Sequence, residues 1–298
     1  MHKLSIIVPT KNEENGPKIV RELMEAFGDG TEIIVVDKSN DEYYEALAKT
    51  KATVIRQRSQ GYENAIMEGF AIASGDILAS LDADGTYSVE DLKKVVNALE
   101  SDERYDFVSG SRFGNMSKDA MEWHLKFGNI MLAKIFNLLY KQNMHDVLSG
   151  SFAMTRRAYE KIKNIEAYRA GTIFFEIEII RKGYKIKDIP ISYRARAGTK
   201  SKITKAKPVY GLVMAYHAIR YARDYNPLVI FGGIGLVLVV AGLALGIYVI
   251  MNFIASGVFN EIGRALIAFM LVVLGFLSIV TGFLLDLMLE IDKKIYEK

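Results

Sequence analysis

The stretch D-I-L-A-S-L-D-A-D-G, residues 76–85, joins a short apolar run to two carboxylates that are one residue apart. The run has the length and composition of a buried β-strand. Asp82 and Asp84 end it, and Gly85 is a turn-forming residue. If the chain remains extended there, both carboxylates point to one side. Because Mg²⁺ binds one or two carboxylates and completes its shell with water and phosphate oxygens, the pair predicts a site for a divalent cation.

The alternative is that the two aspartates only cap a helix or fill a turn. Ser88 and Asp91 already form an S-x-x-D capping signature for the helix expected to follow. Asp84 is therefore not needed as the cap of that helix, and this favours the cation site.

Short apolar runs and helical patterns alternate on both sides of this stretch, through residues 1–200. The predicted strands are 4–9, 32–37, 53–56, 76–82 and 106–110, and the predicted helices are 16–27, 43–49, 64–73 and 89–99. Such an order predicts an α/β sandwich with a mostly parallel sheet. Ligands of such folds bind outside the carboxyl ends of the strands, which is where Asp82 and Asp84 would lie.

The end of the first predicted strand narrows the class of nucleotide-binding protein. It reads P-T-K-N-E-E at residues 9–14, with neither G-x-G-x-x-G nor the G-K-S/T of a phosphate loop. Dinucleotide-dependent dehydrogenases and P-loop NTPases are therefore disfavoured.

Composition excludes further classes. The formal net charge of +3 is too small for a nucleic-acid-binding protein, and we expect no such partner. The chain has no cysteine, which excludes disulfides, thiolate metal sites and cysteine nucleophiles. Its first residues contain a short apolar run interrupted by Pro9, without the apolar length or cleavage site of a signal peptide. We therefore expect the N-terminal part to stay in the cytoplasm.

Two long uncharged runs near the C-terminus predict a membrane hairpin. The first, Leu228–Met251, would be about 36 Å long as a helix, enough to cross about 30 Å of hydrocarbon. The second runs from Ala265 to Leu285, and the two spans are expected at about 228–251 and 265–287. Neither run has the polar stripe of a helix that packs in a soluble core, which is the alternative.

Charges around the hairpin predict its orientation. The connecting stretch 252–263 has no Lys or Arg, whereas Arg220 and Arg223 precede the first span and three lysines follow the second. Basic residues favour the cytoplasmic side, so the N-terminal part and both termini should be cytoplasmic.

Residues 205–225 mix apolar side chains with Tyr, Lys and Arg, as an interfacial amphipathic helix does; a helix packed on the catalytic domain is the alternative. The expected organisation is a cytoplasmic catalytic domain at 1–203, an interfacial segment at 204–226 and a membrane hairpin with a short tail at 227–298.

Four stretches taken in order resemble the family-2 glycosyltransferases. They are S-I-I-V-P-T-K-N-E-E (5–14), I-I-V-V-D-K-S-N-D (33–41), A-S-G-D-I-L-A-S-L-D-A-D-G (73–85) and G-S-R (110–112). Two later ones, followed by the paired spans, resemble the dolichyl- and polyprenyl-phosphate hexose synthases of that family. They are H-D-V-L-S-G-S-F-A-M-T-R-R (145–157) and D-I-P-I-S-Y-R-A-R-A-G-T-K-S-K (188–202).

The resemblance implies a GT-A fold and a membrane-anchored, inverting enzyme. Such an enzyme transfers a hexose, of the mannose or glucose type, from a GDP- or UDP-linked sugar to dolichyl or polyprenyl phosphate, with Mg²⁺ or Mn²⁺ as cofactor. The lipid-linked sugar then serves as a donor for glycosylation. A homo-oligomer is compatible with the sequence.

The resemblance also implies roles for individual residues. The nucleotide would contact Pro9, Thr10, Glu13, Asp37 and Asp82, and the metal and diphosphate would be held by Asp82 and Asp84. The catalytic set would be completed by Arg112, Asp146 and Arg196, and the acceptor phosphate would contact Arg112, Ser149, Arg196, Lys200, Ser201 and Lys202.

Two departures from the family pattern concern the nucleotide. Lys38 stands where a second aspartate is usual, and S-Q-G-Y-E-N (59–64) replaces a G-K-G-like stretch. Both bear on the choice of donor and leave the D-x-D pair intact.

The chemistry of a phosphate acceptor agrees with these residues. A phosphate monoester has its second pKa near about 6, so it is largely a dianion at neutral pH and needs no strong general base. It needs neutralisation and orientation, which Arg112, Arg196, Lys200 and Lys202 can supply.

Two other classes stay open as alternatives. One is a catalytically inactive, membrane-anchored scaffold that binds nucleotide sugars, which Lys38 favours and the intact D-x-D disfavours. The other is a family-2 transferase with another acceptor, of which a polysaccharide synthase should carry Q-x-x-R-W and more spans; neither is found.

Overall fold

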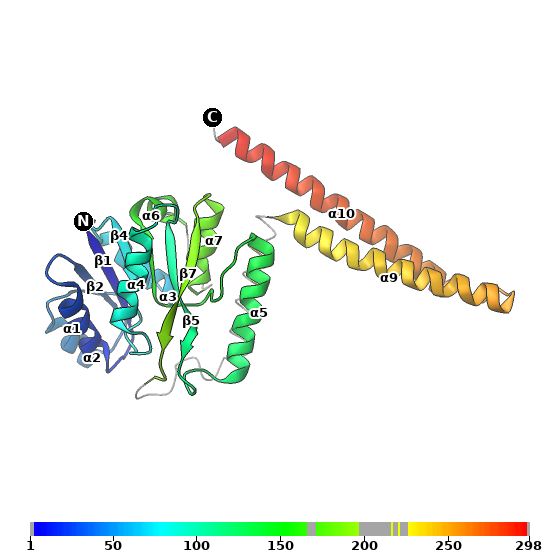
Figure 1. Cartoon of the computed structure of the whole chain (residues 1–298). Coiled ribbons are helices and arrows are strands. Elements are labelled where there is room, and N and C mark those ends of the chain that lie inside the picture. Colours follow the sequence, from blue (N-terminus) through cyan, green and yellow to red (C-terminus); the bar gives the residue numbers. More distant parts are fainter. Residues whose placement is uncertain (1–2, 166–170, 197–215, 217–219, 221–225, 297–298) are drawn as a thin grey trace. The chain divides into compact units, whose positions relative to one another are not determined.

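The computed structural model describes residues 3–165, 171–196, 216, 220 and 226–296. Contacts divide the chain into two compact units, Met1–Ala218 and Ile219–Lys298 (Figure 1). The predicted interfacial segment 204–226 lies outside the described residues, apart from Tyr216, Arg220 and Asn226.

The first unit alternates strands and helices along the chain. Its strands are β1 (Leu4–Thr10), β2 (Glu32–Asp37), β3 (Thr53–Arg56), β4 (Ile77–Ser80), β5 (Phe107–Met116), β6 (Phe152–Thr155) and β7 (Ile186–Tyr193). Its helices are α1 (Gly16–Phe27), α2 (Asp41–Ala48), α3 (Tyr62–Ile72), α4 (Val89–Glu100), α5 (Trp123–Tyr140), α6 (Arg156–Ile162) and α7 (Ile173–Arg181).

The strands form one sheet in the order β3-β2-β1-β4-β6-β5-β7. All neighbouring pairs are parallel except those of β6, which is antiparallel to both β4 and β5. The predicted α/β sandwich with a mostly parallel sheet is therefore confirmed. The five strands and four helices predicted from the sequence are present, with ends that differ by at most six residues, at the end of β5.

Helices cover both faces of the sheet (Figure 1). Alternate residues of β1 illustrate the two cores, since successive side chains of a strand point to opposite faces. Ile6 packs in a cluster with α1 and α4, through residues such as Leu23 and Leu92. Ile7 faces α3, where Gly69 lies so close that an added Cβ would be 2.6 Å from the Ile7 side chain.

The direction of β6 brings the functional loops to one edge of the sheet. The parallel strands β1, β2 and β4 all end there, at Thr10, Asp37 and Ser80. Since β6 runs the other way, its first residue, Phe152, pairs with Ser80 at the end of β4. The loop that precedes β6 therefore lies beside the residues that follow β4.

Helix α4 begins where the capping signature predicted, directly after Ser88 at the N-cap position. The Ser88 side chain makes no capping hydrogen bond, however. Asp91 instead accepts a hydrogen bond from the Ser192 backbone at 3.0 Å and pairs with Lys94. The helix start was predicted correctly, but Asp91 ties the helix to the end of β7 rather than closing a capping box.

The second unit consists of α9 (Pro227–Ser256) and α10 (Ile262–Tyr296). Segments Pro227–Ser256 and Ile262–Leu289 are long and apolar enough to cross a membrane, with mean hydropathies of 2.8 and 2.6. Only 11% and 17% of their most apolar windows are buried, unlike the core helices of a soluble domain. A pair of membrane helices is therefore the better interpretation.

Glycines allow these two helices to touch along their length. A Cβ added to Gly235 would lie 2.5 Å from the carbonyl oxygen of Gly275, and one added to Gly242 would lie 2.8 Å from that of Ala268. Small residues at such positions let helix backbones approach closely, which is the main source of packing energy between helices in lipid.

We expect Gly235→Ala to weaken the hairpin by about 1–3 kcal/mol, the usual cost of overpacking. Gly233→Ala is the matched control, because nothing lies within 4 Å of a Cβ there. Since the chain has no cysteine, dyes can be placed on the exposed positions Leu236→Cys and Leu274→Cys. Energy transfer during an SDS titration then reports helix separation. Equal midpoints for both alanine variants would contradict close packing at Gly235.

Candidate active site

A cavity of about 1240 Å³ lies at the edge where these loops converge. The ends of β1, β4 and β7, the start of α3, and α5 all contribute to its wall. Of the residues predicted for the site, Pro9, Thr10, Glu13, Asp82, Asp84, Arg112 and Arg196 line this cavity.

The carboxylate of Asp82 is held from two sides. Tyr62 donates a hydrogen bond to its Oδ1 at 2.5 Å. Gly150, at the end of the loop before β6, lies against its Oδ2, since an added Cβ would be 2.2 Å from that oxygen. Tyr62 belongs to the 59–64 stretch that departs from the family pattern, so this departure supplies a partner for the D-x-D pair.

Asp84 lies in a turn rather than on an extended strand. The strand ends at Ser80, and residues 83–84 form a turn that Gly85 completes with φ +77°. Asp84 Oδ1 accepts hydrogen bonds from both the backbone N–H and the hydroxyl of Thr86. The expectation of an extended chain is therefore wrong, although both carboxylates do reach the same cavity.

Burial and neighbouring carboxylates both disfavour the ionised form of Asp82. Burial, followed by the negative charge of Asp84, raises the pKa of Asp82 to about 7. The hydrogen bond from Tyr62 and the charge of Arg112 act in the opposite direction, and Glu13 raises the pKa further. The arrangement favours any cation that enters the cavity near these oxygens.

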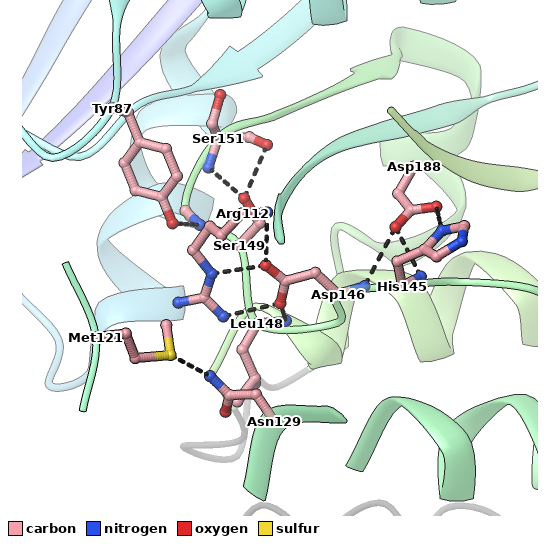
Figure 2. Close-up of polar contacts among 11 residues, drawn as sticks. Tyr87, Arg112, Met121, Asn129, His145, Asp146, Leu148, Ser149, Ser151 and Asp188 are labelled. Atoms are coloured by element: carbon pink, nitrogen blue, oxygen red, sulfur yellow. Dashed lines mark hydrogen bonds and ion pairs between the residues drawn. The ribbon is translucent and has the colours of Figure 1, made fainter. Parts of the chain in front are cut away.

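Arg112, which also lines the cavity, forms a buried bidentate pair with Asp146 (Figure 2). Its Nε and Nη2 donate to the two carboxylate oxygens at 2.6 and 2.8 Å, and its backbone N–H adds a third bond at 3.0 Å. Burial alone would lower the pKa of Arg112. The charge and hydrogen bonds of Asp146, together with Tyr87 and Tyr193, outweigh burial, so the pKa stands well above its ordinary value. Arg112 therefore keeps its charge at any physiological pH.

Asp146 does not line the cavity; it is fully buried behind Arg112. Burial raises its pKa, but Arg112 lowers it more, so the carboxyl is ionised. Its position is fixed in turn by Asp188 on β7, whose carboxylate accepts hydrogen bonds from the backbone of His145 and Asp146. We expect Asp146 to orient the guanidinium, which leaves contact with substrate to Arg112 itself.

Glu176 on α7 was not predicted from the sequence. This side chain is 1% exposed, and neither of its carboxylate oxygens has a hydrogen-bond partner among the described residues. Burial, and after it the charges of Asp146 and Asp188, raise the pKa of Glu176 well above its ordinary value. The surroundings of Glu176 therefore favour its uncharged form.

Arg196 faces the acidic side of the cavity. Its guanidinium forms an ion pair with Glu13 and approaches Asp84 Oδ2 at 3.7 Å. The sequence predicted Arg196 for the acceptor phosphate, together with Lys200, Ser201 and Lys202. These last three lie outside the described residues.

The nucleotide residues predicted at the ends of β1 and β2 divide into two groups. Pro9 and Thr10 line the cavity, and so does Lys38, whose ammonium donates to the Ser59 carbonyl at 3.0 Å. Asp37 is fully buried and does not line it. Its carboxylate accepts hydrogen bonds from Thr10, Ser39 and Arg56, so its visible role is to hold these neighbours.

Ser149 is likewise buried and lies outside the cavity wall. Its hydroxyl exchanges weak hydrogen bonds with the backbone of Ser151, at 3.3 and 3.4 Å (Figure 2). Next to it, the Gly150 N–H donates to the Tyr87 hydroxyl at 2.9 Å. One short loop thus touches Arg112 through Asp146 and Asp82 through Gly150.

The carboxylates suit a hard divalent cation that is shared with a phosphate ligand. Within the described residues, no group of three acidic or histidine side chains is close enough to hold a metal alone. Asp84 Oδ2 and Asp82 together offer the one or two carboxylates that Mg²⁺ or Mn²⁺ takes when a diphosphate supplies further oxygens. The guanidinium of Arg196 already shows that a cation is accepted beside Asp84.

Helix α5 supplies an apolar wall that sequence reasoning missed. Its side chains in the cavity, with those just before it, include Met121, Leu125, Met131, Leu132 and Ile135. Its outer face also exposes Trp123 (80%), Phe127 (61%) and Leu138 (70%). The apolar residues of 123–140 follow a helical period, but that pattern alone does not distinguish a helix that lines a cavity from a core helix.

This chain belongs to glycosyltransferase family 2, because the model of that family, Glycosyl transferase family 2, matches residues 5–163. That match agrees with the fold and with the D-x-D pair at the end of β4. The resemblance noted in the sequence is thereby confirmed.

The names of two similar proteins agree with this family assignment. The chain is 31% identical over 211 residues to a dolichyl-phosphate hexose transferase of Haloferax volcanii, covering 70% of this chain and 88% of the relative. It is 34% identical over 207 residues to a low-salt glycan biosynthesis hexosyltransferase of the same organism, covering 65% of this chain but only 48% of the relative. Its match thus spans about half of that second protein.

A solved structure supports the fold alone. Glucosyl-3-phosphoglycerate synthase of Mycobacterium tuberculosis, in complex with Mn²⁺, UDP-glucose and phosphoglyceric acid, superposes with a TM-score of 0.59 at 17% identity. The match covers 74% of this chain and 80% of that one. The GT-A fold expected from the sequence is therefore confirmed.

The raised pKa of Asp82 predicts a pH-dependent penalty on folding. Between about pH 4, where an unfolded aspartate ionises, and pH 7, the folded protein binds a proton that the unfolded chain has lost. Stability from this group is therefore present at low pH and lost as pH rises through 7. Asp82→Asn, which mimics the protonated acid, should gain stability relative to the parent over that range.

We expect the difference in Tm between Asp82→Asn and the parent to rise by at least about 3 °C from pH 5.5 to pH 8, the equivalent of about 1 kcal/mol. Thermal unfolding of the full chain in detergent with EDTA measures it. Asp29→Asn, in an exposed turn, is the matched control. A difference that stays constant with pH would show that Asp82 is ionised throughout.

The contact between Gly150 and Asp82 predicts coupling between the two residues. Gly150→Ala should destabilise the chain by about 1–3 kcal/mol through overpacking, and by clearly less in an Asp82→Ala background, where the clashing carboxylate is gone. Gly128→Ala, with open space around its Cβ, should be harmless. Chemical unfolding of the four cycle variants gives the coupling energy. Additive effects would show that the loop does not press on Asp82.

Proposed function

We propose that this protein is a membrane-anchored, inverting glycosyltransferase that moves a hexose from a GDP- or UDP-linked sugar to dolichyl or polyprenyl phosphate. One observation carries the proposal. A single cavity has an acidic wall at Asp82 and Asp84, a buried arginine at Arg112, and an apolar wall from α5. The first suits a metal–diphosphate, the second a phosphate, and the third a hydrocarbon chain.

The acidic wall would receive the donor. When bound, Mg²⁺ or Mn²⁺ would neutralise the negative charge that develops on the leaving nucleoside diphosphate. Asp84 Oδ2 is directed to the cavity because Thr86 holds the other oxygen. Asp82, kept in place by Tyr62 and Gly150, would orient the nucleotide end of the donor. A synthase with the same fold was solved in complex with Mn²⁺.

The part of the wall that contains Arg112 would receive the acceptor. A lipid phosphate is largely a dianion at neutral pH, so the chain need not supply a base. Arg112 presents a charged guanidinium whose orientation is fixed by Asp146. Fixing it in advance lowers the entropy lost on binding and aims the phosphate at the sugar. A single displacement from the opposite face would invert the anomeric carbon.

The lipid chain accounts for the apolar features of α5. A soluble phosphorylated acceptor would need none of the apolar lining that Leu125, Met131 and Leu132 provide. The exposed stripe of Trp123, Phe127 and Leu138 further suits contact with lipid, and the nearby Lys126 and Lys134 suit anionic headgroups. The name of the dolichyl-phosphate relative supports the same acceptor class.

The two apolar helices would anchor the enzyme in the cell membrane. The lack of Lys and Arg in residues 252–263 supports a hairpin with the catalytic unit and both termini in the cytoplasm. Two spans are too few to form a transport channel. The anchor would keep the catalytic unit at the surface where its lipid acceptor lies.

The full chain in detergent should convert a short-chain polyprenyl phosphate to a hexosyl-phosphoryl lipid, which mass spectrometry detects, with one of a panel of GDP- and UDP-sugars. EDTA should abolish turnover, and Asp84→Ala should reduce it at least about 100-fold, as for loss of a main electrostatic stabiliser.

Two further arms of this assay separate the alternatives. The first uses 3-phosphoglycerate in place of the lipid phosphate, and we expect no transfer to this soluble phosphorylated acceptor. The second measures hydrolysis of the nucleotide sugar without an acceptor. A catalytically inactive scaffold should show no metal-dependent hydrolysis. Transfer to 3-phosphoglycerate in place of the lipid, or turnover unaffected by EDTA, would contradict the proposal.

A further inference from the structure

The guanidinium of Arg196 lies beside Asp84, where a metal ion bound to Asp84 would also lie. Its Nη1 lies 3.7 Å from Asp84 Oδ2, and its Nη2 forms an ion pair with both oxygens of Glu13. The three side chains are only 14–19% exposed. The guanidinium is thus enclosed between carboxylates from two different loops, the one after β1 and the one after β4.

The oxygen that faces Arg196 is the one left for a ligand. Asp84 Oδ1 already accepts two hydrogen bonds from Thr86, so Oδ2 is its cavity-facing oxygen. A divalent cation on Oδ2 and a guanidinium within 4 Å of the same atom would repel each other strongly in a partly buried site. The two cations therefore compete for Asp84.

We propose that Arg196 is the resident counter-cation of the D-x-D pair in the substrate-free enzyme, and that it leaves Asp84 when the metal and donor bind. Glu13 is then a positioning residue, which holds Arg196 at the cavity until that exchange. The inference rests on the proposed function, because it requires a metal site at Asp84.

The exchange has a consequence for the order of binding. While Arg196 is paired with Glu13 and Asp84, its positive charge is neutralised, so it would bind a further anion only weakly. Once it is released from Asp84, its guanidinium is available to an acceptor phosphate. Donor with metal should therefore bind before the lipid phosphate. Because coupling between two ligands of one site is reciprocal, Arg196 must weaken metal binding by the same factor as the metal weakens the pairing of Arg196 with Asp84.

Mn²⁺ binding to the full chain in detergent, without any substrate, tests this exchange. Electron paramagnetic resonance measures free Mn²⁺. Removing the competitor with Arg196→Ala should tighten Mn²⁺ binding about fivefold or more, the lower range of typical coupling between sites. Arg194→Ala removes the same charge two residues earlier, from an exposed side chain, and should change the affinity far less.

A second measurement uses the parent protein and needs no variant to fold. Phenylglyoxal modifies accessible arginines, and mass spectrometry compares Arg196 with Arg194 in the same peptide. Mn²⁺ alone should increase the modification of Arg196 several-fold and leave that of Arg194 unchanged.

The outcomes separate this inference from the proposed function. If Mn²⁺ binds the parent but not Asp84→Ala, while Arg196→Ala leaves the affinity unchanged or weakens it, the exchange is wrong and the metal site stands. Equal gains from Arg196→Ala and Arg194→Ala, or unchanged labelling of Arg196, also overturn the exchange. If the parent binds no Mn²⁺ without substrate, or Asp84→Ala binds it equally well, the exchange is wrong. The proposed metal site fails as well only if UDP and GDP with Mn²⁺ also bind the parent and Asp84→Ala equally.

Discussion

The structure of the catalytic unit depends on the crowding of carboxylates at one edge of its sheet. Asp82, Asp84 and Glu13 are brought there by the ends of two adjacent strands. Burial, and after it the negative charges of Asp84 and Glu13, raise the pKa of Asp82 to about 7. Every neighbour with a proton or positive charge offsets that repulsion. Tyr62 donates to Asp82, and Arg196 pairs with Glu13 close to Asp84. A carboxyl group whose pKa is shifted this far by burial and by a charged neighbour inside a cavity is typical of an active site.

The antiparallel strand β6 connects this acidic edge to the buried arginine. Because β6 starts where β4 ends, the loop before it runs from Asp146, behind Arg112, to Gly150, against Asp82. A parallel strand in that place would have put this loop at the far edge. The single reversed strand thus lets one short loop support both walls of the cavity.

Much of the fold could be predicted from the sequence, because the strands that carry it are local apolar runs. The limits of β2 and β3, and those of α1, agree with the predicted ranges. The strand β6 was not predicted, since four residues, F-A-M-T, carry no periodicity that separates a strand from a helix start. Nor were α5, α7 and β7, which lie in the part of the chain interpreted through family resemblance alone.

The residues of the candidate site were likewise predictable only in part from the sequence. Asp82, Asp84 and Arg112 could be assigned because each follows a strand or matches a short motif, and the cavity contains all three. The partners of these residues could not be assigned, because they come from far along the chain. Tyr62 reaches Asp82 across 20 residues, and Arg196 reaches Glu13 across 183. Local patterns also could not show that Asp37 and Asp146 lie behind the cavity wall, since burial is a property of the folded chain.

The central claim is that one cavity takes a nucleotide sugar at its acidic wall and a lipid phosphate at its arginine and α5 wall. Photocrosslinking tests it most directly, with a polyprenyl phosphate that carries a diazirine in its first isoprene unit and the full chain in detergent. Mass spectrometry of the crosslinked peptides should find label on the cavity side chains Met121, Leu125 and Met131, with competition by unlabelled polyprenyl phosphate. Label confined to α9 and α10, or no competition at the α5 residues, would contradict the account.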